Sequence, residues 1–457
     1  MCIQGCFRPR SARGAYFIFA NLVLPTRTTV WLFVAALALL PLGVVFTPFR
    51  WLLLGFQVGL LALVFVDARV ARGGVVRVRR DRPARLSLGA ENEITLVVEN
   101  LSGRALVLTL RDTPPAEFRA QPALLDVLLP PHSTVRAPYQ LLPTERGDFP
   151  FGDIHVRCRG PLGLAWIDRT LPAAETAPVY PNLLEIRRYE ALLRSTLARA
   201  GGYRTRRYLG GGREFSHFRD YSPDDDYKAV NWKATARRGR PITAVYETEH
   251  SQDIIFCLDV GRMMAARVGG LTKLDHAINA ILMLSHVSQA FQDNLGLLIF
   301  SHEVLQWLPP AKGRAQHAQF LQALYSVKPA LCHVNYRVAF QKLIAEHSKR
   351  ALTMVFTDLL DATVSSEYRD AVRLLRHYHL PLTLAVADVP LQQLAASTPA
   401  AARPMYDVLV ARDLLHGRAE MLRGLERQGV MVLDTVPERL TVDAVNKYLA
   451  IKTGVKM

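Results

Sequence analysis

Two apolar stretches in succession near the N-terminus constrain this chain more than any other feature. Residues 28–49 carry no charged side chain, and a helix needs roughly 20 predominantly apolar residues to cross the hydrocarbon core of a bilayer. A second apolar run covers residues 51–66 and is slightly short for a span, so it predicts local thinning of the bilayer. Pro41 lies within the first run but is tolerated in membrane helices. The close spacing of the runs predicts a transmembrane helical hairpin over residues 28–67, with its turn around 47–50.

Arginine residues flank this hairpin on both sides and predict its orientation. Positively charged flanks stay on the cytoplasmic side of a membrane. Both termini are therefore expected in the cytoplasm, with the chain in the inner (cytoplasmic) membrane as a multi-pass protein and residues 1–27 as its basic N-terminus. A cleaved signal peptide and two buried helices of a soluble domain are the alternatives, and the lack of an obvious cleavage site opposes the first. The flanking arginines are Arg8, Arg10, Arg13 and Arg27 before the hairpin, and Arg69, Arg72, Arg77, Arg79, Arg80, Arg82 and Arg85 after it.

The formal net charge of the chain is +16. A basic balance is compatible with nucleic acid, anionic lipid or an acidic partner. For an anchored protein, lipid is the simpler explanation because juxtamembrane arginines are attracted to anionic headgroups. No nucleic-acid-binding signature is visible, so no nucleic-acid partner is expected.

Short strands are predicted between residues 73 and 178. Segments such as 94–98 and 105–110 have strand-like composition, and Pro and Gly punctuate the intervening stretches. Many short strands at regular spacing are typical of an antiparallel β-sandwich or barrel. We therefore expect a β-sandwich-like domain with a structural or interaction role, followed by a linker helix near 182–200.

The segment 213–241 interleaves aromatic side chains with charges of both signs. Its three consecutive acids, residues 224–226, are compatible with a divalent-cation site because hard cations favour clustered carboxylates. They also fit a helix N-terminus, because Ser222 is a good N-cap, Pro223 suits the first turn, and acids favour that end of the helix dipole. In this second and favoured interpretation, Trp232 anchors a core and nearby arginines pair with the carboxylates.

A long motif runs through and just ahead of this segment: Gly212, Glu214, Phe215, Arg219, Tyr221, Asp225, Asp226, Trp232, Ala236 and Arg237. It resembles the signature of the family known as domain of unknown function 58. The resemblance implies an N-terminal membrane hairpin, a β region, the motif and a von Willebrand factor A-like domain, and it covers nearly the whole chain. Asp224 and Lys228 depart from the family pattern, where Gly and Arg are usual, without threatening the assignment.

After residue 251, apolar strands alternate with amphipathic helices. Continuous apolar strands such as 254–258, 295–300 and 352–357 are typical of a mostly parallel, doubly wound sheet with helices on both faces. The expected fold is therefore multi-domain: two transmembrane helices, an antiparallel β-sandwich-like domain and a C-terminal α/β von Willebrand factor A-like domain. The predicted boundaries are 1–27, 28–67, 73–178, 179–250 (linker helix and motif) and 251–457.

Two acids stand at predicted strand ends, which is where such sheets bind ligands. Asp259 and Asp358 match the two aspartates of the metal-ion-dependent adhesion site that the von Willebrand resemblance implies. The two serine positions of that site are Gly261 and Met263, and Asn335 is the nearest candidate for its threonine. Two carboxylates and water hold Mg²⁺ or Mn²⁺ only weakly. The site is therefore predicted to be degenerate, with no firmly bound cofactor.

Lys273 supplies a positive charge in the same part of the chain. We expect its ammonium group to pair with Asp259 or Asp358 in place of a cation. Replacing Lys273 by Ala would then destabilise the domain without changing any response to metal. If the two acids do not bind a metal, they cap helix N-termini or hold loops by hydrogen bonds.

No Walker loop, HExxH, GxSxG or nucleophilic cysteine context occurs in the chain, so we do not expect an enzyme. We expect a membrane-anchored, non-enzymatic scaffold or adaptor whose von Willebrand factor A-like domain binds protein partners. The family resemblance implies a MoxR-type AAA+ ATPase and other membrane proteins as partners, in complex assembly or envelope maintenance, with no small-molecule substrate. The alternative is a metal-dependent hydrolase or phosphodiesterase that uses Asp224, Asp225 and Asp226, or Asp259 and Asp358.

Overall fold

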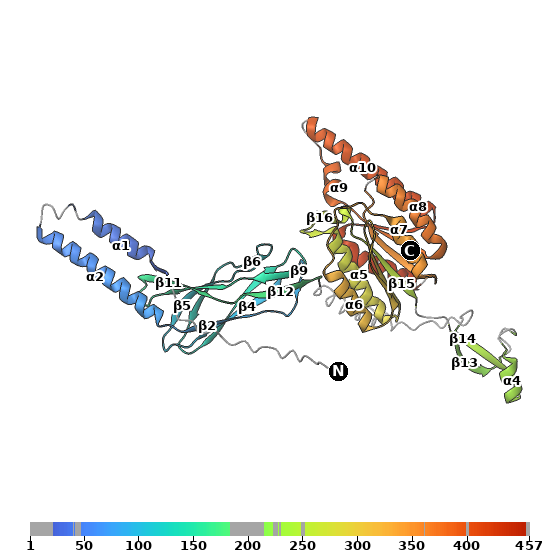
Figure 1. Cartoon of the computed structure of the whole chain (residues 1–457), viewed down its shortest axis with the longest axis horizontal. Helices are drawn as coiled ribbons and strands as arrows, with labels where there is room; N and C mark the ends of the chain where they lie inside the picture. The colour runs from blue at the N-terminus through green and yellow to red at the C-terminus, as the bar shows by residue number, and fades with distance from the viewer. Residues whose placement is uncertain are drawn as a thin grey trace, which may run out of the picture. The chain divides into compact units, whose positions relative to one another are not determined.

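A computed structural model of the chain divides into two compact units, Met1–Tyr180 and Pro181–Met457, which are described separately (Figure 1). The structure describes residues 22–39, 41, 47–182, 214–222, 227, 230–247, 252–360, 362–398 and 402–453. Several predictions lie outside these residues: most of the basic N-terminus, nearly all of the linker helix at 182–200, and the motif residues Gly212, Asp225 and Asp226.

Two helices open the first unit, α1 (Arg27–Ala38) and α2 (Thr47–Arg72). The side chain of Thr26 accepts a hydrogen bond from the Thr29 amide and caps α1. The prediction of one continuous helix over 28–49 is wrong, because α1 ends before Pro41, whose ring disfavours helix at the preceding residue. The predicted turn around 47–50 is wrong as well, because these residues already belong to α2.

Within the described residues, one helix is long and apolar enough to cross a membrane, and it covers Trp51–Arg72 of α2. At 1.5 Å per residue, the 12 residues of α1 rise about 18 Å, which is less than the ~30 Å of a hydrocarbon core. The 26 residues of α2 rise about 39 Å, which is enough. Most large apolar side chains of α2 are exposed, among them Trp51, Leu52, Phe56, Val58, Leu61, Phe65 and Val66.

The rest of the first unit is built from strands in three sheets, and the predicted antiparallel β region is confirmed. The sheet orders are β1-β11-β10-β5-β7, β2-β4-β8-β6 and β3-β12-β9. The strands are β1 (Leu22–Pro25), β2 (Val76–Asp81), β3 (Leu86–Ser87), β4 (Asn92–Asn100), β5 (Leu106–Arg111), β6 (Arg119–Gln121), β7 (Leu125–Leu129), β8 (Thr134–Leu142), β9 (Gly147–Phe151), β10 (Ile154–Arg159), β11 (Ala165–Leu171) and β12 (Glu175–Tyr180).

Strand β1 lies within residues 1–27, the predicted basic N-terminus, where no strand was predicted. It pairs antiparallel with β11, so that Leu22 lies opposite Asp168 and Pro25 opposite Ala165. The chain therefore contributes an edge strand to the β sheet before α1 begins. Along β4 buried side chains alternate with more exposed ones, and the side chains of Ile94 and Leu96 are fully buried.

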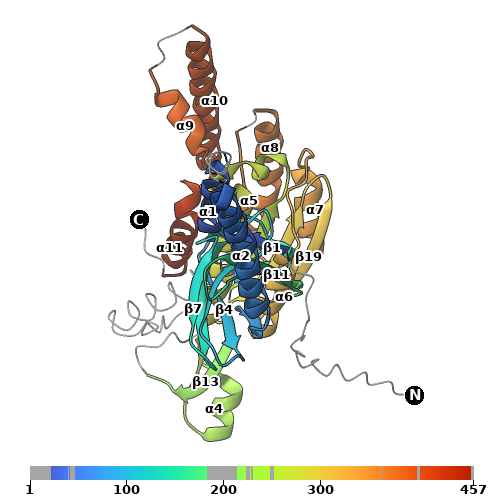
Figure 2. The ribbon, with the colours of Figure 1, turned by 90° about the vertical axis from the view of Figure 1, so that its left-hand side faces the viewer.

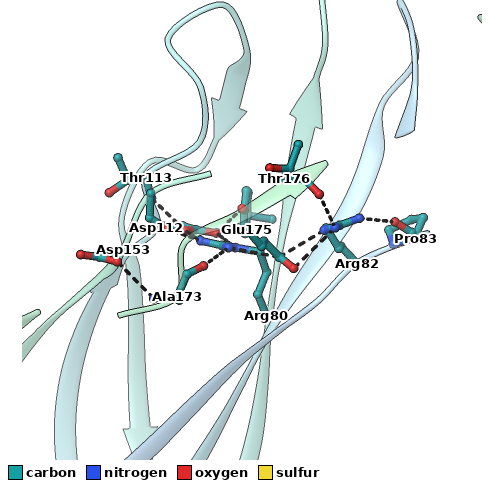
Figure 3. A network of polar contacts seen from close by, with 11 residues as sticks. Arg80, Arg82, Pro83, Asp112, Thr113, Asp153, Ala173, Glu175 and Thr176 are labelled. Carbon is teal, nitrogen blue, oxygen red and sulfur yellow. Dashed lines mark hydrogen bonds and ion pairs between the residues drawn. The ribbon is translucent and has the colours of Figure 1, made fainter. Parts of the chain in front are cut away.

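A buried arginine joins several strands of this unit (Figure 3). Arg80 of β2 makes a two-pronged contact with Asp112, at 2.8 and 2.5 Å, and also donates to Glu175 of β12 at 3.1 Å. The carbonyl oxygens of Ala173 and Gly152 accept its remaining donors at 2.8 and 3.0 Å. Every N–H donor of the Arg80 guanidinium therefore has a partner, and the carboxylates of Asp112 and Glu175 compensate its buried positive charge. These contacts hold the surrounding strands together.

The second unit contains a six-stranded sheet in the order β19-β18-β15-β20-β21-β22. All neighbours are parallel except β19, which runs antiparallel at one edge. The predicted α/β organisation with a mostly parallel sheet is therefore confirmed. The strands are β15 (Asp253–Asp259), β18 (Asn294–Phe300), β19 (Val304–Ala311), β20 (Leu352–Thr357), β21 (Leu380–Val386) and β22 (Met431–Thr435).

Helices cover both faces of this sheet and bury two separate apolar cores. One core contains residues of α5 (Lys273–Ala290), α6 (Arg314–Tyr325) and α11 (Leu440–Thr453). The other contains residues of α7 (Tyr336–Glu346), α8 (Ala362–Tyr378) and α10 (Ala402–Arg427). The short helix α9 (Val389–Ala396) packs against α10. The two-sided burial explains why the central strands consist almost wholly of apolar residues.

A small substructure precedes this sheet and carries the described part of the motif. It consists of β13 (Glu214–Asp220) and β14 (Ile242–Glu247), which pair antiparallel, and the helix α4 (Trp232–Arg238) between them. The side chain of Asn231 accepts the Ala234 amide and caps α4. Near Asp259, η3 (Arg262–Ala265) leads into a two-stranded ribbon, β16 (Arg267–Val268) and β17 (Leu271–Thr272).

Candidate functional site at the carboxyl end of the parallel sheet

Three neighbouring strands bring acidic side chains to one edge of the sheet. Asp259 is the last residue of β15, Asp358 directly follows β20, and Asp388 follows β21 by two residues. Because these strands are parallel and adjacent, their carboxyl ends lie together, and this edge is the usual ligand-binding edge of such sheets. The structure therefore brings the predicted pair, Asp259 and Asp358, to the same edge and adds a third acid.

Lys273 occupies the centre of this cluster. Its Nζ donates to Asp358 Oδ2 and to Asp388 Oδ2, each at 2.7 Å, and its side chain is fully buried. The expectation that Lys273 pairs with one of the two predicted acids is thus confirmed for Asp358. Asp388 was not predicted, although an acid at the end of a strand followed by Val389-Pro390 is typical of a helix start. Asp388 Oδ1 accepts the Leu391 amide at 3.0 Å and caps α9.

Asp259 is held by other partners. Its Oδ1 accepts the Gly261 amide at 2.7 Å, and its Oδ2 accepts the hydroxyls of Thr357 at 2.7 Å and Tyr336 at 3.2 Å. Complete burial raises the pKa of Asp259 to about 6, although these three hydrogen bonds oppose the shift. The carboxylate therefore serves as an internal acceptor that fixes the loop after β15 and the start of α7.

The two Lys273 partners differ in their electrostatics. Burial raises the pKa of Asp358 despite the ammonium group beside it, and its Oδ1 has no hydrogen-bond partner. For Asp388, burial also acts to raise the pKa, but the Lys273 and Leu391 hydrogen bonds outweigh it and the pKa is lowered. Asp358 is thus the acid that depends most on Lys273 for charge compensation.

The place of the first adhesion-site serine is sterically closed. A Cβ atom on Gly261 would lie 2.3 Å from Val334 Cγ2, which is far inside van der Waals contact. Asn335, the nearest candidate for the threonine, caps α7 by accepting the Val338 amide at 3.1 Å. No group of three or more His, Cys, Asp or Glu side chains within the described residues is arranged to hold a metal ion. What the described residues show here is an internal ion-pair network.

The described motif residues lie elsewhere in the second unit. Glu214, Phe215 and Arg219 belong to β13, whereas Ala236 and Arg237 belong to α4 and are exposed. Trp232 is 59% exposed and meets the Tyr227 ring edge-on at 5.4 Å, so the prediction that it anchors a core is wrong. Of the predicted pairing of arginines with acids, the described residues show the neighbouring pair Arg240–Asp220, at 2.9 Å. Tyr221 follows β13, and its amide donates to the Pro241 carbonyl at 3.0 Å.

An arm rises from the same edge as the ion-pair network. It consists of α9, which Asp388 caps, and the first half of α10, residues 402–414, and both extend away from the sheet (Figures 1 and 2). Leu422 and Leu425 in the second half of α10 belong to the apolar core, and Arg418 nearby makes a two-pronged contact with Asp434 at 2.8 Å. The first half presents exposed apolar side chains: Met405, Tyr406, Leu409, Val410 and Leu414. The sequence analysis did not predict this arm.

The first unit has a polar cluster of its own, at the base of α2. Asp67 is fully buried and accepts the amides of Leu162, Leu164 and Ala165 at 2.8, 2.9 and 3.0 Å. A Cβ atom on Gly160 would lie 2.2 Å from the Asp67 carboxylate, so this contact requires glycine. The turn between β10 and β11 is therefore held directly against the last turns of α2.

Comparison with known proteins places the second unit in a family. Residues 217–401 match the sequence profile of the family described as "Protein of unknown function DUF58". The uncharacterized protein Rv1480 of Mycobacterium tuberculosis is 22% identical over 153 residues, which cover 33% of this chain and 48% of that protein. The uncharacterized protein Mb1516 of Mycobacterium bovis matches to the same extent. The match thus spans about half the length of these curated relatives.

Two solved structures are similar to parts of the chain. The conserved hypothetical protein BatB from Bacteroides thetaiotaomicron has a TM-score of 0.29 and 12% identity, and the match covers 45% of this chain and all of that one (100%). The CARDB domain of the PF1109 protein from Pyrococcus furiosus has a TM-score of 0.17 and 15% identity, and the match covers 24% of this chain and 94% of that domain. At these TM-scores, neither likeness bears on function.

Proposed function

The chain belongs to the DUF58 family, and from that premise we propose that it is a membrane-anchored, non-enzymatic scaffold whose α/β unit binds a protein partner. In this proposal α2 inserts into the inner membrane, with α1 beside it as the second leg of a hairpin. The termini and both units lie on the cytoplasmic side, in keeping with the arginine-rich flanks of the hairpin.

The α/β unit is proposed to be von Willebrand factor A-like. Its mostly parallel six-stranded sheet, two-sided helical cover and acids at strand ends support this. Such domains hold a metal ion at this end of the sheet, and in this proposal the Lys273 ammonium group, which pairs with Asp358 and Asp388, supplies positive charge there instead. We propose that this internal cation replaces the metal, so that partner binding does not depend on a bound ion.

The apolar arm is the observation that carries the proposal. Tyr406 is 70% exposed and Leu409 is 55% exposed, although burial of such side chains is favourable by about 1.5–3 kcal/mol each. Contiguous apolar surface on a water-facing helix marks interaction sites. Because Asp388 joins the base of the arm to Lys273, the ion-pair network holds this surface at the ligand-binding edge of the sheet.

The partner proposed is a MoxR-type AAA+ ATPase, which the family resemblance implies, together with other membrane proteins in complex assembly or envelope maintenance. The arm supplies an apolar contact surface for such a partner. Asp259 accepts three internal hydrogen bonds and Asp358 pairs with Lys273, which supports binding rather than catalysis as the role of this edge.

Co-purification from membranes tests the proposal. The full chain is solubilised, captured in the presence of ATP or ADP, and the retained proteins are screened by mass spectrometry for an AAA+ ATPase. We expect retention in one nucleotide state and at least a ten-fold loss of it in the variant Tyr406→Asp/Leu409→Asp. The matched control is Leu305→Asp, which changes a 50% exposed leucine on β19. Absence of an AAA+ ATPase with both nucleotides, or equal retention by the arm variant, would contradict the proposal.

A further inference from the structure

A basic hollow lies at the base of α2, beside the turn that Asp67 holds. Its volume is about 440 Å³, and it is open to solvent. The residues that line it come from the end of α2, the start of β5 and the turn between β10 and β11. They include two arginines, Arg104 and Arg159, and no acidic residue.

Both arginines retain free donors. Arg104 is half-buried, and its Nη2 donates to the Val70 carbonyl near the end of α2. Arg159 is exposed, and its guanidinium lies over the Trp166 ring, 5.8 Å from the ring centroid. Each guanidinium carries five N–H donors, so most donors of both groups remain available to an anion in the hollow.

The surroundings add positive charge. Burial lowers the pKa of Arg169, and repulsion from Arg104 and Arg72 lowers it further. Arg169 donates to the carbonyls of Gly74 and Arg72, both at 2.7 Å, and so caps the end of α2. The buried acid Asp67 is directed at the turn, where it accepts three backbone amides, and it contributes one negative charge against the four arginines. An anion in the hollow would therefore relieve a local excess of positive charge.

The hollow lies at a defined level along α2. The apolar run of α2 ends at Val66, and Asp67 in the next position holds residues 162–165 by their amides. If α2 spans the bilayer, this turn lies where the hydrocarbon ends and the headgroups begin. Leu162, at the turn, is 57% exposed, as suits a side chain that dips into the boundary of the acyl chains.

From this geometry we infer that the hollow is a binding site for the phosphate group of an anionic phospholipid in the membrane that holds α2. Arg104 and Arg159 donate to the phosphate oxygens, and Leu162 contacts the acyl chains of the same lipid. The inference rests on the proposed membrane insertion of α2 and is independent of the proposed protein partner. It assigns a binding role to a face of the β unit that carries no other assigned role.

Lipid binding is tested with the full chain in neutral detergent micelles, titrated with phosphatidylglycerol or with phosphatidylcholine and followed by native mass spectrometry. We expect saturable binding that favours phosphatidylglycerol. The variant Arg104→Gln/Arg159→Gln should bind it about 25-fold more weakly, because each arginine at an anionic surface is worth roughly a five-fold factor. The matched control Arg136→Gln, an exposed arginine of β8, should bind like the wild type.

A second variant keeps the test decisive if the double variant folds poorly. Ala105 is exposed and lines the hollow, so Ala105→Glu adds a carboxylate without removing a contact and should also abolish the preference. Equal binding of phosphatidylglycerol by all variants would overturn the inference. So would inorganic phosphate that competes as well as the lipid does, because the ligand would then be free phosphate. A separate measurement, alkaline extraction of membranes that contain the chain, tests the membrane insertion of α2. Release of the chain in that measurement would refute the insertion rather than the lipid site.

Discussion

Replacing Lys273 by Met tests whether an internal cation holds the strand-end network together. The ammonium group is fully buried, and both of its carboxylate partners lie at 2.7 Å. Without it, Asp358 keeps a buried carboxylate whose Oδ1 already has no partner. Removing one member of a buried ion pair typically lowers the free energy of unfolding by about 3–5 kcal/mol. We expect Lys273→Met to lower the free energy of unfolding of the α/β unit by an amount in this range.

The pH dependence of this loss has a definite sign. Burial already raises the pKa of Asp358, and Lys273 opposes that shift, so the variant should raise this pKa further. A group with a raised pKa in the folded state binds more protons when folded, and stability then falls as pH rises towards that pKa. The destabilisation by Lys273→Met should therefore be smaller at pH 5 than at pH 8.

Hydrogen exchange of the full chain in detergent, resolved by mass spectrometry, measures the effect within the α/β unit alone. Amides of β15 and β20 should exchange two to nearly four powers of ten faster in the variant, which corresponds to the expected loss. The control Lys342→Met removes a half-exposed ion pair with Glu346 and should change stability by less than about 0.5 kcal/mol.

The double variant Lys273→Met/Asp358→Asn also neutralises Asp358. It should restore most of the protection of the β15 and β20 amides from hydrogen exchange, because no unpaired buried charge remains. Two results would refute the reasoning. One is a Lys273→Met variant no less stable than the Lys342→Met control. The other is a Lys273→Met variant that Mg²⁺ restores, since the edge would then be a metal site.

Three further changes test neighbouring parts of the account. In the wild type, the free energy of unfolding should fall by up to about 3 kcal/mol as pH rises from 4 to 6, because the pKa of Asp259 is about 6 in the folded state against an ordinary value near 4. Asp259→Asn should remove this fall; thermal unfolding across that pH range checks it, and an unchanged slope would contradict it. Asp67→Asn should speed amide exchange in residues 162–165 by roughly 30-fold, through weakening of charge-assisted hydrogen bonds, whereas unchanged exchange would show that the turn is held otherwise. Gly261→Ser should destabilise the α/β unit by about 1–3 kcal/mol without creating Mg²⁺ affinity, because its side chain meets Val334; calorimetric titration that detects tight Mg²⁺ binding would refute this.

Local sequence pattern was enough to predict the order of the parts. Strand-like segments in the β region and continuous apolar strands after residue 251 both follow from which faces are buried, and the structure confirms both. The helix boundaries near the N-terminus were less predictable. Arg50 looks like a break between two apolar runs, yet it lies within α2, because one charge near a helix end does not stop the helix.

The site was only partly predictable because it depends on contacts between distant residues. Asp259 and Asp358 were predicted because they stand at strand ends and match the family resemblance, and Lys273 was predicted to pair with one of them. Asp388 was not predicted, and it lies 115 residues beyond Lys273 in the chain. The steric closure at Gly261 depends on Val334, which no local pattern reveals. The arm was missed for a different reason: its apolar residues have helical spacing, and pattern alone does not distinguish a buried apolar face from an exposed one.

The side of the membrane on which the α/β unit lies is the most direct test of the whole account. In a cysteine-free chain, His416→Cys places one thiol at an exposed position of α10. An impermeant maleimide should label it in inside-out membrane vesicles and leave it unlabelled in intact cells, while the chain stays in the membrane pellet after alkaline extraction. Labelling in intact cells, or release of the chain by alkali, would contradict a scaffold that α2 anchors at the cytoplasmic face.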